Sequence, residues 1–179
     1  MTSWLRVAHG IDRLNQWAGR IAVWLVLIAC LVSAAVAFAR YAFNIGSNAW
    51  LEVQWYLFAG MVMLGAAYTL KVNEHVRVDV LYGNLSPRNK AKLDLAGLIV
   101  FLMPAMLLLA WLSWPFFASS FAEAETSANP GGLIRWPVKL MLPLGFALVA
   151  LQGVSEIIKR IAYLRGVYDM PLQYDRPLQ

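Results

Sequence analysis

The side chains able to do chemistry are few and stand at the ends of long apolar segments. Glu52 precedes an uncharged segment that runs from Val53 to Leu70. A charged group follows this segment, and it comprises Lys71, Glu74, His75, Arg77 and Asp79. Because a histidine titrates near neutral pH and can bind haem, His75 suggests a proton switch or a haem ligand. The other histidine, His9, lies near the N-terminus outside the apolar segments, which disfavours a haem clamped between two spans. The favoured interpretation is that His75, Arg77 and Asp79 fix a cytoplasmic connector and bind lipid headgroups or a partner.

Patterns of catalysis and metal binding are missing from the rest of the sequence. It has no glycine-rich phosphate loop, no nucleophile with an adjacent base and no metal-ligand spacing. The single cysteine, Cys30, sits inside an apolar run, which excludes a disulfide framework and favours a small core residue. The sequence therefore predicts a protein that is not an enzyme and that carries no cofactor or metal.

Glu52 has two interpretations. At the start of a helix, its carboxylate is stabilised by the positive end of the helix dipole, and Arg40 across a short loop could pair with it. Alternatively, an acid at the membrane edge can form a contact between subunits or part of a coupling path. The structural interpretation is favoured, because an acid at the membrane surface costs far less free energy than one at the midplane.

The elements that carry these residues are membrane spans. Of the 179 residues, 60% are hydrophobic and 14% are charged, and the mean hydropathy is +0.58, which indicates an integral membrane protein. A helix of about 20 apolar residues crosses a bilayer core of roughly 30 Å. The sequence predicts an all-α protein with four transmembrane helices, at 20–41, 50–71, 87–121 and 136–164. Glu156, Lys159 and Arg160 mark the exit of the last one.

The third predicted span is longer than a bilayer requires. Its uncharged part runs from Leu95 to Ala122, and Pro104 and Pro115 each remove a backbone hydrogen bond. This span is therefore expected to tilt or bend at the prolines.

The segment 3–18 is predicted to be an amphipathic arm on the membrane surface. Its apolar residues recur every three or four positions, whereas Arg6, Arg13 and Arg20 repeat every seven on another face. The arm is interpreted either as an anchor that contacts membrane lipids and a partner or as a simple lead-in to the first span.

Three further segments connect or follow the spans. The connector 74–85, which includes His75, Arg77 and Asp79, alternates like a strand, but a lone strand at a membrane lacks a partner. A surface helix or an extended connector is therefore favoured. The segment 122–135 has a loop composition, and the tail 166–179 is expected to be partly ordered or laid on a partner.

Small residues line one face of the second span. Ala59 and Gly60 stand seven positions before Ala66 and Ala67, so the four share a face on which helix backbones can approach closely. The sequence predicts a packing seam here, against another helix of this chain or of a partner subunit.

The positive-inside rule gives the orientation. With the N-terminus in the cytoplasm, 12 of the 15 Lys and Arg residues lie inside, and only Arg40, Arg135 and Lys139 lie outside. Both termini are therefore expected in the cytoplasm, and the 122–135 loop with Glu123 and Glu125 in the periplasm. Because the basic residues stand at span ends, the net charge of +5 is explained by the membrane and not by nucleic acid.

A stretch of about thirty residues resembles a known family. Trp50 and Glu52 before the second span, Gly65 to Ala67 near its end, and the sequence from His75 to Asp79 after it resemble the signature of the DctQ-like small membrane subunit of tripartite ATP-independent periplasmic (TRAP) transporters. Pro143-Leu144-Gly145 adds a weaker similarity. What the HVRVD segment does mechanically does not follow from the residues.

The resemblance implies a non-catalytic small permease subunit in the bacterial inner membrane. Such a subunit would bind a large TRAP membrane subunit and extend its stationary scaffold, while a periplasmic solute-receptor protein delivers a solute, an organic acid, for sodium-coupled uptake. Glu123 and Glu125 are the candidate residues for receptor docking. The few charges within the spans, with no broken helix or inverted repeat, also favour a helper over a conduit.

Two other functions compete with this one. The first is a membrane anchor for an electron-transfer enzyme, in which four helices hold a haem or a quinone. The second is an autonomous small exporter that needs an acid at the middle of the membrane, and Glu52 lies too near the edge for that role.

Overall fold

The computed structural model describes residues 3–73 and 85–169, which are helical apart from short turns and loops. The helices are α1 (Ser3–Phe43), α2 (Asn48–Val72), α4 (Pro87–Gly97), the π-helix η1 (Leu98–Leu102), α5 (Met103–Ala122) and α6 (Trp136–Leu164). The described ranges contain four helical segments long and apolar enough to cross a membrane: α1, α2, the rod Pro87–Ala122 and α6. The prediction of an all-α protein with four spans is confirmed.

Helix α1 differs from the expected division into an arm and a span. Instead of separate elements at 3–18 and 20–41, the chain forms one continuous helix, Ser3–Phe43. Gly19, which stands between the two expected segments, allows close packing: a Cβ atom built on it would lie 2.6 Å from Cγ of Tyr68 on α2. With no proline in this region, nothing interrupts the helical hydrogen bonds between the two parts.

The third span contains an irregularity just before Pro104. Residues Leu98–Leu102 form a π-helix, in which the N–H of Met103 donates to the carbonyl of Leu98. Proline has no N–H to donate and its ring crowds the preceding turn, so a widened turn at this point absorbs the misfit. The helix continues on both sides of η1, so Pro104 and η1 adjust the third span without ending it.

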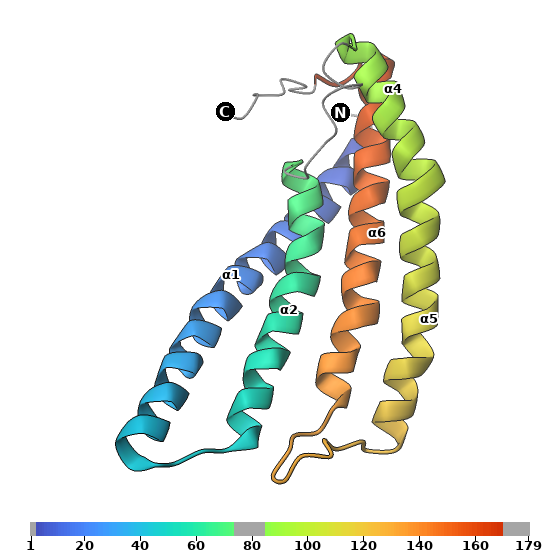
Figure 1. Cartoon of the computed structure of the whole chain (residues 1–179). Coiled ribbons are helices and arrows are strands. Elements are labelled where there is room, and N and C mark those ends of the chain that lie inside the picture. The colour runs from blue at the N-terminus through green and yellow to red at the C-terminus, as the bar shows by residue number, and fades with distance from the viewer. Residues whose placement is uncertain (1–2, 74–84, 170–179) are drawn as a thin grey trace.

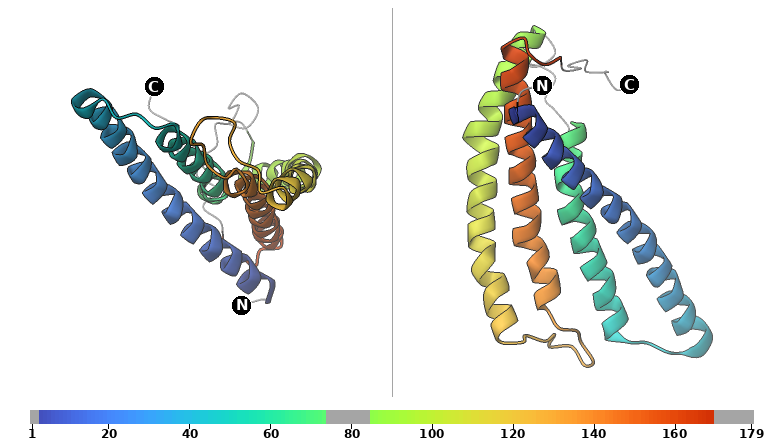
Figure 2. Two further views of the ribbon diagram at one scale, coloured as in Figure 1. Left: turned by 90° about the horizontal axis from the view of Figure 1, so that it is seen from below. Right: turned by 180° about the vertical axis from the view of Figure 1, so that it is seen from behind.

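The spans are arranged as an open row (Figure 1). Helix α2 packs between α1 and α6, and α5 packs on the other side of α6. Helix α1 also crosses α6, and Figure 2 shows that it runs obliquely across the row, meeting α6 only near its own N-terminal end. An open row buries little side-chain surface, and in a membrane its faces are covered by lipid or by a partner.

The two ends of the row differ in what they carry. The start of α1, α4 and the end of α6 lie together at the upper end in Figure 1, called here the terminal end. The α1–α2 turn and the α5–α6 loop lie at the opposite end, called here the loop end.

Small residues bring α2 close to its neighbours. Ala67 is buried in a small core with Ala18 of α1 and Leu148 of α6. Gly60 is buried facing Leu25 of α1, and Gly145 of α6 lies against the backbone and side chain of Met63. The structure thus places two of the four predicted seam residues, Gly60 and Ala67, between helices of this chain, while Ala59 and Ala66 are only partly buried.

Candidate functional site

At the loop end, the carboxylate of Glu52 is buried against the α5–α6 loop. It accepts hydrogen bonds from the hydroxyl of Ser127, from Nδ2 of Asn129 at 2.8 Å and from the backbone N–H of Leu133 at 2.8 Å. Arg135 Nη2 donates to the Ser127 hydroxyl at 3.4 Å, which brings a positive charge beside the group. We call Glu52, Ser127, Asn129, Leu133 and Arg135 the loop-end cluster.

The expected partner of Glu52 was Arg40, and this expectation is wrong. The Arg40 guanidinium lies beside Gly46 in the α1–α2 turn, with its Nη2 3.8 Å from where a Cβ of residue 46 would stand. The donors that reach Glu52 come instead from residues 75 to 81 positions later in the chain. Several hydrogen-bond donors that converge on one carboxylate satisfy it better than one long, exposed arginine side chain.

Two more residues of α2 hold the same loop. The Tyr56 hydroxyl donates to the carbonyl of Ile134 at 3.0 Å, and Nδ2 of Asn48 donates to the carbonyl of Pro130 at 3.2 Å. Asn48, Glu52 and Tyr56 are four residues apart, so they stand on one face of the helix start. The start of α2 is therefore the surface on which the α5–α6 loop rests.

The loop also closes on itself. Thr126 and Ile134 form an isolated antiparallel bridge, and the N–H of Ser127 donates to the carbonyl of Leu133 at 2.9 Å. At the tip, Gly131 has a φ of +70°, a conformation that residues with a side chain rarely adopt. The backbone of this loop is thus shaped by its own turn and by α2.

The two acidic residues expected to dock a receptor lie in different surroundings. Glu123 is exposed, whereas Glu125 forms an ion pair with Lys139, whose ammonium lies 4.0 Å from the centre of the Phe116 ring. The hydrogen bond from Lys139 holds the pKa of the Glu125 carboxyl below its usual value. Glu125 is therefore occupied within the chain, and Glu123 is the acid that a partner can contact directly.

A second polar cluster lies at the terminal end. Asp12 of α1 accepts hydrogen bonds from Gln152 Nε2 at 2.8 Å and from the Ser155 hydroxyl at 2.8 Å. The ammonium of Lys159 lies 3.2 Å from both oxygens of the same carboxylate. These contacts bind the first turns of α1 to the last third of α6.

The same cluster continues to α4. Glu156 forms ion pairs with Lys159 and with Arg160, and Arg160 Nη2 lies 3.2 Å from Oδ2 of Asp94 on α4. Lys159 is 7% exposed and Arg160 is 5% exposed, so both charges are almost fully buried. We call the seven residues the terminal network: Asp12, Asp94, Gln152, Ser155, Glu156, Lys159 and Arg160.

The terminal network was not predicted from the sequence. From the sequence, Glu156, Lys159 and Arg160 only marked the exit of the last span, and their burial in a shared network was not predicted. The available signal was the spacing of Gln152, Glu156 and Lys159, which stand four and three residues apart and so share a helix face. The complementary polar residue on α1, Asp12, lies too far away in the sequence for its pairing to be deduced from spacing alone.

The remaining predicted residues are distributed over the surface. Arg6, Arg13 and Arg20 are exposed along α1, as expected for residues that face lipid headgroups or a partner. Gly65 lies beside Ala22 of α1, since a Cβ built on it would be 3.7 Å from that residue. His75, Arg77 and Asp79 lie outside the described residues.

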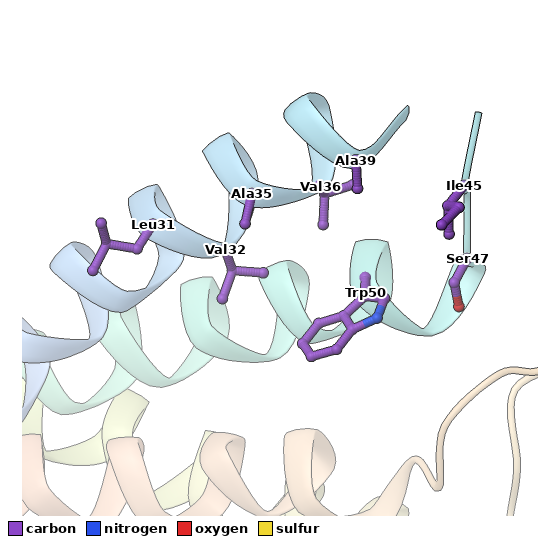
Figure 3. A pocket seen from close by; sticks show the side chains of 8 residues that line it. All are labelled: Leu31, Val32, Ala35, Val36, Ala39, Ile45, Ser47 and Trp50. Carbon is purple, nitrogen blue, oxygen red and sulfur yellow. The ribbon is translucent and has the colours of Figure 1, made fainter. Parts of the chain in front are cut away.

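Trp50 lines an apolar groove between α1 and α2 at the loop end. The groove has a volume of about 460 Å³, and its other lining residues are Leu31, Val32, Ala35, Val36, Ala39, Ile45 and Ser47. Figure 3 shows the α1 side chains pointing toward α2, with Trp50 across from them. The two helices thus diverge here and leave apolar surface open.

The chemistry of both clusters is that of structural contacts. Within residues 3–73 and 85–169, no group of three His, Cys, Asp or Glu side chains is placed to hold a metal ion. Each carboxylate of the two clusters described above accepts hydrogen bonds from side chains or backbone of the chain itself. The clusters therefore fix the positions of helices and of one loop.

Comparison with known proteins identifies a family and a relative that the chain resembles. The family of the DctQ component of tripartite ATP-independent periplasmic transporters matches residues 28–162. The C4-dicarboxylate TRAP transporter small permease protein DctQ of Pseudomonas aeruginosa is 33% identical over 109 residues, which are 59% of this chain and 50% of the relative. The chain thus matches about half the length of that relative. No solved structure matches the chain.

Proposed function

Because the chain belongs to the DctQ component family of tripartite ATP-independent periplasmic transporters, we propose that it is the non-catalytic small permease subunit of a sodium-coupled transporter. It is a multi-pass protein of the bacterial inner membrane. The observation that carries the proposal is the family match over residues 28–162, which includes part of α1 and nearly all of the other three spans. The transported solute is proposed to be an organic acid, by analogy with the C4-dicarboxylate named for the relative.

The proposed role is to stabilise and extend the scaffold of a large membrane subunit. An open row of spans supports this role, because it has apolar faces for a partner subunit on both sides and few charged residues within the membrane. A large subunit that moves solute by changing its own position needs a neighbour that stays fixed. The terminal network, which ties α1, α4 and α6 together, supports such stiffness.

The proposed orientation has the terminal end in the cytoplasm and the loop end in the periplasm. It rests on the excess of Lys and Arg at the terminal end and on the exposure of Arg6, Arg13 and Arg20, which suits anionic lipid headgroups. In this orientation the α5–α6 loop, with the exposed Glu123, meets the periplasmic receptor protein.

Copurification from native membranes tests the assembly. A tagged copy of the chain, extracted in mild detergent, is expected to bring down one large multi-span membrane protein in a fixed ratio. The receptor protein should join when solute is present. Recovery of the chain alone, or with the soluble subunits of a redox enzyme, would contradict the proposal.

The competing function, an anchor for an electron-transfer enzyme, makes a separate prediction. It requires a haem absorption band or an extractable quinone in the purified protein. His9 hydrogen-bonds to the carbonyl of Leu5 through Nδ1 at 2.6 Å, and nothing among the described residues favours this function over the transporter subunit.

A further inference from the structure

Glu52 is a buried acid whose hydrogen bonds all come from one loop. The residue belongs to α2, whereas Ser127, Asn129 and Leu133 belong to the connection between α5 and α6. Glu52 is 3% exposed, so a partner protein cannot contact its carboxylate directly. A buried carboxylate is tolerated only when its oxygens accept hydrogen bonds, which means that the acid and the loop stabilise each other.

We propose that Glu52 is a positioning residue that holds the α5–α6 loop in the shape of a preformed docking surface for the periplasmic receptor. This inference rests on the proposed function, because it takes receptor docking at the loop end as given. In this inference the Glu52 carboxylate does not contact the receptor. It determines the shape of the loop, and the receptor contacts the loop.

The exposed tip of the loop fits this role. Ala128, Asn129 and Pro130, near the tip, are exposed and carry no charge, so the tip offers backbone groups and small uncharged side chains. The partner that fits such a tip is a folded protein surface with complementary shape and neutral hydrogen-bonding groups. A loop already held in its bound shape loses less conformational entropy on binding, which raises affinity.

Two residues of α2, Glu52 and Tyr56, hold the loop with hydrogen bonds of different strength. Glu52 supplies a charged acceptor for three donors, whereas Tyr56 donates one neutral hydrogen bond to the carbonyl of Ile134. Hydrogen bonds to a charged group contribute more than neutral ones. The loop should therefore loosen strongly without the Glu52 carboxylate and weakly without the Tyr56 hydroxyl.

The experiment compares Glu52→Gln, Tyr56→Phe and the matched control Glu123→Lys in the purified transporter complex. Glu123→Lys alters exposed charge on the same loop but removes none of the contacts to α2. Amide hydrogen exchange of the loop, Leu133 above all, is measured together with solute uptake over a range of receptor concentrations.

The expected result separates affinity from turnover. In Glu52→Gln, loop exchange should rise about tenfold or more, and the receptor concentration for half-maximal uptake should rise by a similar factor. Maximal uptake at saturating receptor and copurification with the large subunit should stay unchanged. Tyr56→Phe should show the same changes to a smaller extent, while Glu123→Lys should leave loop exchange unchanged.

Three results would overturn the inference in distinguishable ways. Unchanged loop exchange in Glu52→Gln would mean that the carboxylate does not hold the loop. In a second case, Glu52→Gln speeds loop exchange but leaves the receptor concentration for half-maximal uptake unchanged, whereas Glu123→Lys changes that concentration. The loop would then still dock the receptor, but Glu52 would have no part in docking. Uptake that depends on none of the three residues would remove the docking function itself. If Glu52→Gln does not accumulate, Tyr56→Phe decides by the same criteria.

Discussion

At the scale of single residues, four charged residues among those described are buried at the two ends of the row: Glu52 at the loop end, and Glu156, Lys159 and Arg160 at the terminal end. Arg160 contacts Glu156 and Asp94, and its side chain is 6% exposed. Bringing these charges out of water costs free energy that their mutual attraction offsets only if every partner is present. The network is therefore sensitive to loss of one member, whatever its net contribution to stability.

Replacement of Arg160 by leucine tests this. Arg160→Leu leaves the carboxylates of Glu156 and Asp94 without this cation and should reduce the free energy of unfolding by about 3–5 kcal/mol. The control Arg13→Leu removes an arginine that is exposed on α1 and should change stability little. Unfolding of both variants is measured in detergent against the unsubstituted chain. Equal stability of Arg160→Leu and Arg13→Leu would show that the network does not hold α4 to α6.

The sequence could identify single polar residues but not their pairing. Glu52 was recognised as unusual because it interrupts an otherwise apolar context, yet its donors belong to a loop of ordinary composition about 80 positions later. That Asp12 and Glu156 belong to one cluster was not recognised. Hydropathy measures each position separately, so it carries no information about contacts between distant helices.

At the scale of elements, a glycine allows two helices to approach closely only where another helix lies against it. A Cβ atom on Gly145 would lie 2.6 Å from Cε, 2.7 Å from Cβ and 2.9 Å from the carbonyl oxygen of Met63. The backbone of α2 cannot move aside as easily as the end of a flexible side chain. Gly97, also helical, has no such neighbour within 4 Å.

Alanine at these two glycines should therefore have opposite effects. Gly145→Ala forces α6 away from α2 and should destabilise the chain by about 1–3 kcal/mol. Gly97→Ala meets open space and should be neutral or stabilising by up to about 1 kcal/mol, because alanine favours helix. Thermal unfolding in detergent compares them. A stable Gly145→Ala variant would show that the α2–α6 contact is looser than described.

The elements themselves were largely predictable, since long apolar runs identify spans whatever they pack against. The predicted seam on α2 located Gly60 and Ala67, because small residues repeating at helical spacing are a local signal. Gly19 and Gly145 were missed, because each is a single glycine whose use depends on a helix elsewhere in the chain. The continuity of α1 was left open, because residues 3–18 could be an arm or a lead-in to the span, and the packing of Gly19 against Tyr68 was not visible in the sequence.

At the scale of the whole molecule, the order of the helices determines what the chain can do. The sequence predicted four spans but not that they form an open row, in which α5 touches α6 and α1 touches α2 and α6. Side-chain patterns on each helix are too uniformly apolar to specify neighbours. The helices of this row expose many large apolar side chains, which suits a subunit that works by shape and contact.

The most direct measurement of this account is uptake by liposomes into which the subunits are reconstituted one at a time. The account predicts no solute accumulation by this chain alone, and sodium-dependent accumulation when the large subunit, this chain and the receptor are combined. Leaving this chain out of the complete mixture should abolish accumulation. Solute transport by this chain alone, or full activity without it, would contradict the account.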